Sequence, residues 1–96
     1  MSFPSYVKDP DARLDYEIDW SEWLGSLPAV GDVITDSVWE CDDPAIVLED
    51  AQFDNTSATV FASGGVIGTT YLITNRIETG QGRINDQTIR LKIKAK

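Results

Sequence analysis

The chain has 96 residues, of which 42% are apolar and 9% aromatic, so its size and composition predict one soluble domain with a single hydrophobic core. No apolar run approaches the roughly 20 residues that a transmembrane helix needs. Sixteen acidic and eight basic residues give a formal net charge of −8, which argues against broad electrostatic binding to nucleic acid or to an anionic membrane. We therefore expect neither as a partner.

The chain contains one cysteine, Cys41, and no histidine. One thiol cannot close an intrachain disulfide, and a chain without histidine lacks the commonest general base and the most frequent transition-metal ligand. The N-terminal residues lack the basic start and the apolar stretch of a signal peptide. We expect a protein without catalytic activity or cofactor, stabilised by packing and assembled in a cytoplasm.

The N-terminal residues 1–13 carry Pro4 and Pro10 and show little periodicity, which predicts an extended arm that is free to reach another subunit. The folded domain is then residues 14–96. Its first strand alternates strictly, with an apolar face of Leu14, Tyr16, Ile18 and Trp20 and an acidic face of Asp15, Glu17 and Asp19.

Short β-rich runs continue to the end of the chain. A helical turn is predicted at 21–24, capped by the side chain of Asp19 or Ser21, and a strand at 33–41 has a mixed pattern that indicates a bulge or an irregular edge. Further strands are predicted at 46–48, 51–53, 58–62 and 69–78 and in a final run containing 89–95. This spacing, without a long helix, predicts an all-β fold, a β-sandwich.

The glycine-rich segment 63–68 superficially resembles a phosphate-binding loop, but a strand follows it instead of a helix. We interpret it as a turn whose glycines adopt positive φ or allow close backbone approach. Tyr71, just after this loop, is placed like a tyrosine corner, whose phenol hydrogen-bonds to nearby backbone. We predict a structural role for it.

Other candidate sites have a simpler explanation. The carboxylate pairs along the chain lack the spacing of an EF-hand loop, and Cys41 has no histidine beside which to act as a nucleophile. Trp20, Trp23 and Trp39 could form a sugar-stacking platform, but Trp20 shares the apolar face of its strand. We expect core packing for Trp20 and an exposed contact for Trp23.

Charge is unevenly distributed along the chain. Residues 1–54 contain fourteen acidic and two basic residues, and residues 55–96 contain two acidic and six basic ones. The last strand alternates an apolar face with the basic residues Arg90, Lys92, Lys94 and Lys96. These bases could contact phosphates, could face the acids of the first strand within one sandwich or between subunits, or could form a separate solvated face.

Two groups of short motifs match a known pattern. The first half carries Lys8-Asp9-Pro10-Asp11, Leu14-Asp15-Tyr16, Asp19-Trp20-Ser21, Trp23-Leu24, Gly31-Asp32 and Trp39. The second half carries Ser63-Gly64-Gly65, Gly68-Thr69, Tyr71, Thr74-Asn75, Ile77, Thr79 and Gly82-Arg83. Over most of residues 7–93 the chain resembles small virion proteins of tailed phages, the fiber–tail adaptor or neck proteins with an immunoglobulin-like sandwich. The basic run at the C-terminus is not part of this pattern.

The resemblance implies an immunoglobulin-like antiparallel β-sandwich with an extended N-terminal arm. It also implies a non-enzymatic adaptor that joins neck or tail and fiber components of the virion as a ring-forming homo- or hetero-oligomer. The alternatives are a head-surface decoration protein and, from another class, a carbohydrate-binding module that uses Trp23 or Trp39. The candidate assembly contacts are Tyr6, Lys8, Asp9, Asp15, Glu17, Asp19, Trp23, Arg90, Lys92 and Lys94.

Overall fold

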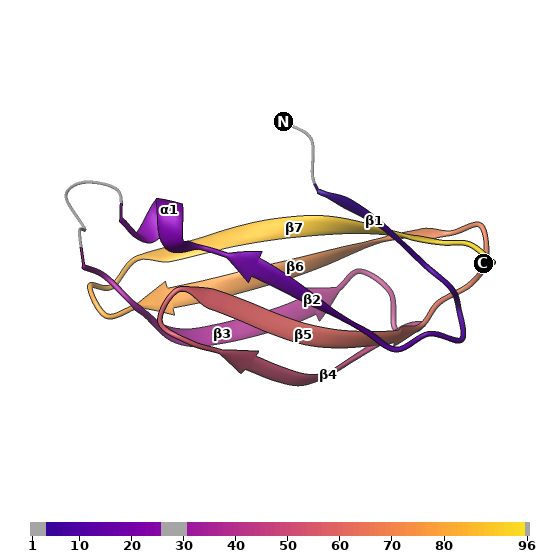
Figure 1. Cartoon of the computed structure of the whole chain (residues 1–96), viewed down its shortest axis with the longest axis horizontal. Coiled ribbons are helices and arrows are strands. Elements are labelled where there is room, and N and C mark those ends of the chain that lie inside the picture. The colour runs from indigo at the N-terminus through magenta and orange to yellow at the C-terminus, as the bar shows by residue number, and fades with distance from the viewer. Residues whose placement is uncertain (1–3, 26–30, 96) are drawn as a thin grey trace.

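The computed structural model describes residues 4–25 and 31–95, which form two sheets packed against each other (Figure 1). The four-stranded sheet has the order β1 (Ser5–Lys8), β7 (Ile84–Ile93), β6 (Thr70–Thr79) and β3 (Ile34–Cys41). The three-stranded sheet has the order β2 (Leu14–Asp19), β5 (Ser57–Gly64) and β4 (Ile46–Phe53). A short helix, α1 (Ser21–Leu24), follows β2. Within the described residues, no helix is long and apolar enough to span a membrane.

The strand orders β7-β6-β3 and β2-β5-β4 are those of an immunoglobulin-like sandwich, in which strands C, F and G form one sheet and B, E and D belong to the other. The predicted all-β sandwich is therefore confirmed. One pairing differs from the antiparallel expectation, because β1 runs parallel to β7. The first strand lies beside the last strand and leaves β2 at the edge of its own sheet.

The segment predicted to be a free arm includes β1, and this part of the prediction is corrected. The N–H of Arg90 donates to the carbonyl of Pro4 at 2.7 Å, and that of Lys94 donates to the carbonyl of Lys8 at 2.9 Å. The rings of Tyr6 and Tyr16 lie 5.2 Å apart between centroids and join β1 to β2. Residues 5–8 are thus held within the chain, whereas residues 1–3 of the predicted arm lie outside the described residues.

The predicted irregularities occur where the strands bend. β3 is an edge strand, and its register to β6 shifts between Ile34 and Asp36, as expected from its mixed pattern. The two short runs predicted at 46–48 and 51–53 form one strand, β4, whose register to β5 shifts between Glu49 and Gln52. Asp50, within that shift, has a positive φ of 53°, so a bulge explains why the alternation breaks in the sequence.

The core fills the space between the two sheets. Buried side chains alternate with exposed or half-buried ones along β2, β5, β6 and the second half of β7, as the period of a half-buried strand requires. The buried members of the core are Tyr16, Ile18, Trp20, Leu24, Ile34, Ile46, Ala62, Tyr71, Ile73, Ile77, Ile89, Leu91 and Ile93. The predicted burial of Trp20 is confirmed, since only 3% of its surface is exposed.

The glycine-rich loop between β5 and β6 is a turn, as predicted. Gly64, Gly65 and Gly68 have φ values of 83°, 100° and 86°, and a Cβ atom on Gly65 would lie 2.7 Å from the side chain of Ile93. The phenol oxygen of Tyr71 accepts a hydrogen bond of 3.0 Å from the N–H of Val66. The structural role predicted for Tyr71 is therefore confirmed.

Replacing Tyr71 with phenylalanine should lower the free energy of unfolding by about 1 kcal/mol, because the ring stays buried while the hydrogen bond to Val66 is lost. Urea unfolding followed by tryptophan fluorescence measures the change. The matched control is Tyr6→Phe, at a partly exposed tyrosine, which should change stability by less than about 0.5 kcal/mol. Equal stability of the two variants would contradict this role.

Candidate functional site

Asn75 connects the two sheets beside the segment that leads from β2 into α1. Its side chain is fully buried. Its Oδ1 accepts a hydrogen bond of 3.0 Å from Trp20 Nε1, and its Nδ2 donates to Ser37 Oγ at 2.8 Å and to the Val38 carbonyl at 3.1 Å. Because a buried amide is costly when it lacks partners, these bonds fix the chain after β2 against β6 and β3.

Arg83 completes the packing beside α1. Its Nε donates to Asp32 Oδ2 at 3.1 Å and its Nη2 to the Leu24 carbonyl at 3.2 Å. The guanidinium lies 4.0 Å from the centroid of the Trp23 ring, and Trp23 meets Trp20 edge to face at 5.6 Å between centroids. One structural cluster thus contains five residues of the motifs quoted above, namely Trp20, Trp23, Asp32, Asn75 and Arg83.

The sequence predicted an exposed contact for Trp23, and the structure corrects this prediction. Its ring is partly buried, with Arg83 over one face and Trp20 at its side. A sugar-binding platform presents an open aromatic face. The covered ring argues against Trp23 as a sugar-stacking platform and indicates a stabilising role for this residue.

The Asp32 side chain is almost completely buried beside Arg83. Burial raises the pKa of its carboxyl, but hydrogen bonds from four neighbours outweigh burial and hold the pKa below the ordinary aspartate value. The donors are Thr79, Arg83 and the backbone N–H groups of Gln81 and Val33. Asp32 is therefore an ionised carboxylate that joins the start of β3 to the β6–β7 turn.

Because the folded-state pKa of Asp32 lies below its unfolded-state value of about 3.9, the ionised carboxylate stabilises the fold at higher pH. This stabilisation is lost as the pH falls through the folded-state pKa. Asp32→Asn should lower the free energy of unfolding at pH 7, and its difference from wild type should shrink as the pH falls below about 4. Urea titrations between pH 7 and pH 2 test this.

The control for this titration is Asp15→Asn, because Asp15 is exposed on β2 and makes no ion pair within the described chain. It should leave the free energy of unfolding at pH 7 close to that of wild type. A constant difference between Asp32→Asn and wild type at every pH would refute the assignment.

The structure corrects the expectation for Lys8, which was a candidate assembly contact. Its side chain is completely buried, and Nζ donates to the carbonyls of Asp9 and Ala12 at 2.7 Å each. Burial lowers the pKa of Lys8, against the opposing effect of Asp9 and Asp11. Lys8 stabilises the turn between β1 and β2 and has no side-chain surface to offer a partner.

The acidic stripe consists of Asp15, Glu17 and Asp19, which all point to the outside of the three-stranded sheet. All three are exposed. Asp19 Oδ1 also accepts the N–H of Ser21 at 2.9 Å, and hydrogen bonding to Ser21 lowers the pKa of Asp19. Trp20 occupies the N-cap position of α1 and makes no side-chain capping bond, whereas the Asp19 carboxylate accepts the N–H of the first helical residue.

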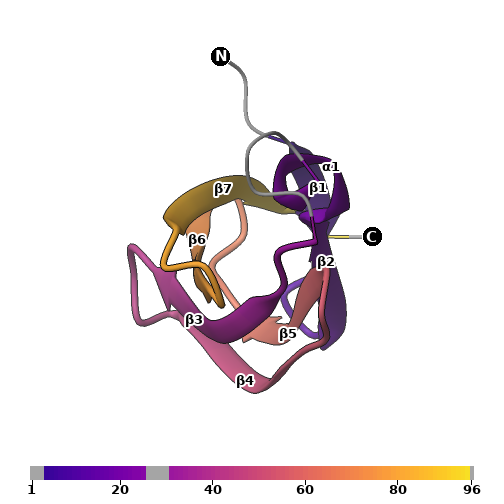
Figure 2. The same cartoon turned by 90° about the vertical axis from the view of Figure 1, so that its left-hand side faces the viewer.

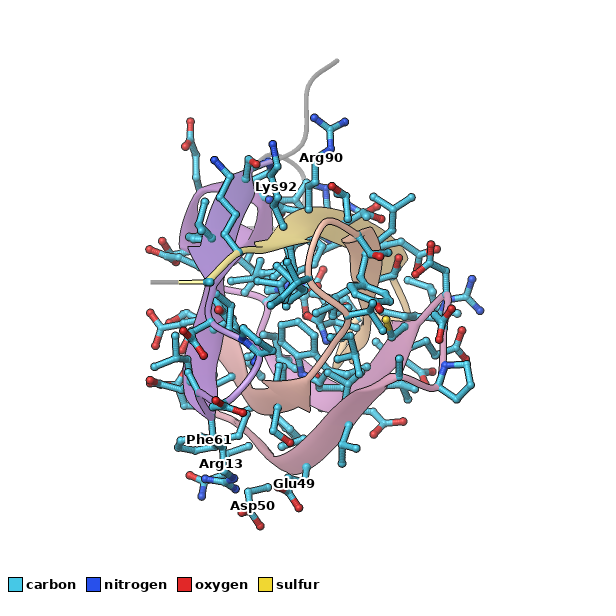
Figure 3. All side chains as sticks on the ribbon, turned by 90° about the vertical axis from the view of Figure 1, so that its right-hand side faces the viewer. Arg13, Glu49, Asp50, Phe61, Arg90 and Lys92 are labelled. Atoms are coloured by element: carbon cyan, nitrogen blue, oxygen red, sulfur yellow. The ribbon has the colours of Figure 1, made fainter. Side chains whose placement is uncertain are left out.

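A second charged cluster lies on the same sheet and was not predicted from the sequence. Arg13 Nε donates to Glu49 Oε1 at 2.9 Å, and its Nη2 pairs with Asp50. The guanidinium also lies 4.2 Å from the centroid of the Phe61 ring (Figure 3). In the sequence, the only indication of this cluster is that Arg13 is one of two basic residues in a strongly acidic half. Its partners could not be identified there, because they come together only when β4 pairs with β5.

The basic stripe consists of Arg90, Lys92 and Lys94, which are exposed on the outside of the four-stranded sheet. Figure 3 shows Arg90 and Lys92 projecting from β7, on the other side of the molecule from the Arg13 cluster. Arg90 lies opposite Leu72 of β6 and Ser5 of β1. Lys96, which the sequence added to this stripe, lies outside the described residues.

The two stripes do not meet within one chain. β2 and β7 belong to different sheets, and among residues 4–25 and 31–95 no ion pair joins an acid of one stripe to a base of the other. The topology thus excludes the predicted pairing on neighbouring strands. Pairing of the stripes between subunits stays a prediction.

The described residues contain no group of three or more cysteine, aspartate or glutamate side chains arranged to hold a metal ion. Cys41 is partly buried, and burial raises the pKa of its thiol. Its Sγ lies 3.6 Å from Asp42 Oδ1. A protonated thiol beside a carboxylate is a poor nucleophile.

Comparison with known proteins agrees with this geometry. The chain is similar to the solution structure of the PKD domain from KIAA 1837 protein, with a TM-score of 0.56 and 18% identity over 98% of this chain and 81% of that one. At this identity the likeness supports the fold alone. No curated protein matches the sequence. The family model of podophage GP4 fiber-tail adaptor protein gp77 matches residues 8–92, and the chain belongs to this family.

Proposed function

We propose that this chain is a non-enzymatic adaptor that joins tail or neck components of a phage particle to fibers, and that its copies assemble side by side. Membership of the fiber-tail adaptor family supports a structural role in the phage tail, with other tail or fiber proteins as partners. Buried polar contacts, the Trp20–Asn75 hydrogen bond and the Arg83–Asp32 ion pair, stabilise the sandwich, and its outer faces are charged. This combination suits a rigid connector, which needs matched surfaces and no catalytic group.

The observation that carries the proposed assembly is the separation of charge between the two sheets. Each stripe has three like charges at every second residue, a spacing of about 6.6–6.8 Å, and neither stripe is neutralised by the other within the chain. A contact between the acidic stripe of one copy and the basic stripe of the next uses two different surfaces. Such a heterologous contact forms a ring when the rotation closes.

Each cross-subunit pair of exposed charges contributes only about 0.2–1 kcal/mol. The stripes would therefore specify register and partner, while the bulk of the binding energy would come from contacts with tail and fiber proteins. The subunits would be made in the host cytoplasm and incorporated at the neck or tail of the virion.

Reversing one charge in either stripe should weaken self-association. Glu17→Lys and Lys92→Glu should each lower the association constant severalfold, because a favourable pair becomes repulsive, and the double variant should recover most of the loss. Sedimentation velocity at about 50 and 500 mM salt measures the effect, and association should be weaker at high salt. Glu22→Lys, on the exposed surface of α1, controls for net charge. Failure of the double variant to recover would refute the contact.

The copy number distinguishes an adaptor from a head-surface decoration protein. An adaptor at the neck or tail should be present at a few to a few tens of copies per particle, set by the symmetry of the tail. Quantitative mass spectrometry of purified particles, with the major capsid protein as internal standard, gives this number. Hundreds of copies would indicate a head lattice and contradict the proposal.

A further inference from the structure

The edge of β2 that faces away from β5 has no partner strand. The N–H of Trp20 donates to the carbonyl of Thr56 at 2.8 Å. The backbone N–H and C=O groups of Trp20, and of every second residue before it in β2, therefore point toward β5. Because hydrogen-bonded residues alternate in an antiparallel pair, the N–H and C=O groups of Asp15, Glu17 and Asp19 face the open side. Nothing in the described chain pairs with that side.

The opposite side of the sandwich is built differently. There, the edge strands β3 and β4 both carry register shifts, and Asp50 adds a positive φ within β4. Such irregularities hinder the addition of another strand. The pairing of β2 with β5 is regular along all six residues. Figure 2 shows β1 beside β2 on this side, but the two strands belong to different sheets.

The side chains around this edge define the chemistry of a strand that could pair there. Directly opposed residues on neighbouring strands have Cβ atoms about 4.5–5.5 Å apart, so the outward side chains of an added strand would lie beside the acidic stripe. Its inward side chains would lie beside Tyr16 and Ile18, which belong to the core. A matching segment therefore alternates basic and apolar residues.

A second copy of this chain cannot supply that segment readily. Pairing of two β2 edges would bring acids opposite acids, which is unfavourable. The alternating basic run of the chain, residues 90–94, is already occupied, since β7 pairs with β1 on one side and with β6 on the other. These two obstacles favour a segment from a different protein.

We propose that the open edge of β2 binds an extended segment of a tail or fiber protein by strand addition, and that this segment alternates basic and apolar residues. Backbone hydrogen bonds to Asp15, Glu17 and Asp19 would give affinity, and the three carboxylates would select the partner by charge. This inference rests on the proposed adaptor function and names the partner chemistry of one of its surfaces.

A seven-residue peptide of alternating valine and lysine is the probe, with fluorescence anisotropy as the binding measurement. The peptide should bind, more weakly at high salt. A version N-methylated at the amides that face β2 keeps the side chains but cannot donate these hydrogen bonds, and should bind at least tenfold more weakly. Amide hydrogen exchange should show that the N–H groups of Asp15, Glu17 and Asp19 become protected when the peptide binds.

Two variants at one position separate backbone pairing from charge. Glu17→Pro removes an N–H that the chain itself does not use, and proline is tolerated on the open side of an edge strand; it should lose at least tenfold in peptide affinity. Glu17→Gln keeps the N–H and should lose less. Absence of binding, equal binding of the N-methylated peptide, unprotected amides, or equal loss in a folded Glu17→Pro and Glu17→Gln would overturn the inference.

The result is separable from the proposed self-assembly. Lys92→Glu alters the basic stripe and leaves β2 unchanged, so this variant should bind the peptide like wild type while self-association falls. If self-association is insensitive to Lys92 but peptide binding follows the pattern above, the assembly contact fails and strand addition stands. If Lys92→Glu weakens self-association but the peptide does not bind as described, strand addition fails and the assembly contact stands.

Discussion

The hydrogen bond between the Trp20 indole and the Asn75 amide is the contact on which the packing of the two sheets near α1 depends. Trp20 follows the three-stranded sheet, and Asn75 lies on a central strand of the four-stranded one. Once the indole occupies Oδ1, the amide nitrogen is directed toward β3. The same tryptophan packs on Trp23, which in turn holds Arg83 near Asp32. One polar contact in the core thus organises α1, β3 and the β6–β7 turn.

This arrangement explains what could be predicted from the sequence. Alternation identified Trp20 as buried, and in the sequence Asn75 has the same parity as the apolar residues Tyr71, Ile73 and Ile77. Both assignments depend only on neighbours along the chain. Their contact spans 55 residues and follows from the packing of two sheets, for which the sequence has no local signal. The corner formed by Tyr71 was predictable, since its hydrogen-bond partner lies five residues away.

The errors have equally specific causes. Lysine is almost never buried, so the pattern of β1 did not reveal that Lys8 would donate to two carbonyls of the turn that follows it. The pairing of β1 with β7 joins the two ends of the chain. Two proline residues and weak periodicity suggested an arm because a four-residue edge strand is too short to show its alternation.

The position of β1 links the fold to both proposed surfaces. By pairing with β7, β1 covers the backbone of the strand that carries the basic stripe, so those bases act only through their side chains. Because β1 pairs with β7, it does not pair with β2. The acidic stripe therefore lies on an edge strand that has no partner on one side. The basic side chains on β7 can therefore orient a neighbour only by charge. The acidic side chains on β2 lie beside backbone N–H and C=O groups that have no partner strand, so this strand can also form hydrogen bonds with a neighbour. An adaptor needs such unequal surfaces, because one that bound equally well at both could not distinguish its own copies from its fiber or tail partner.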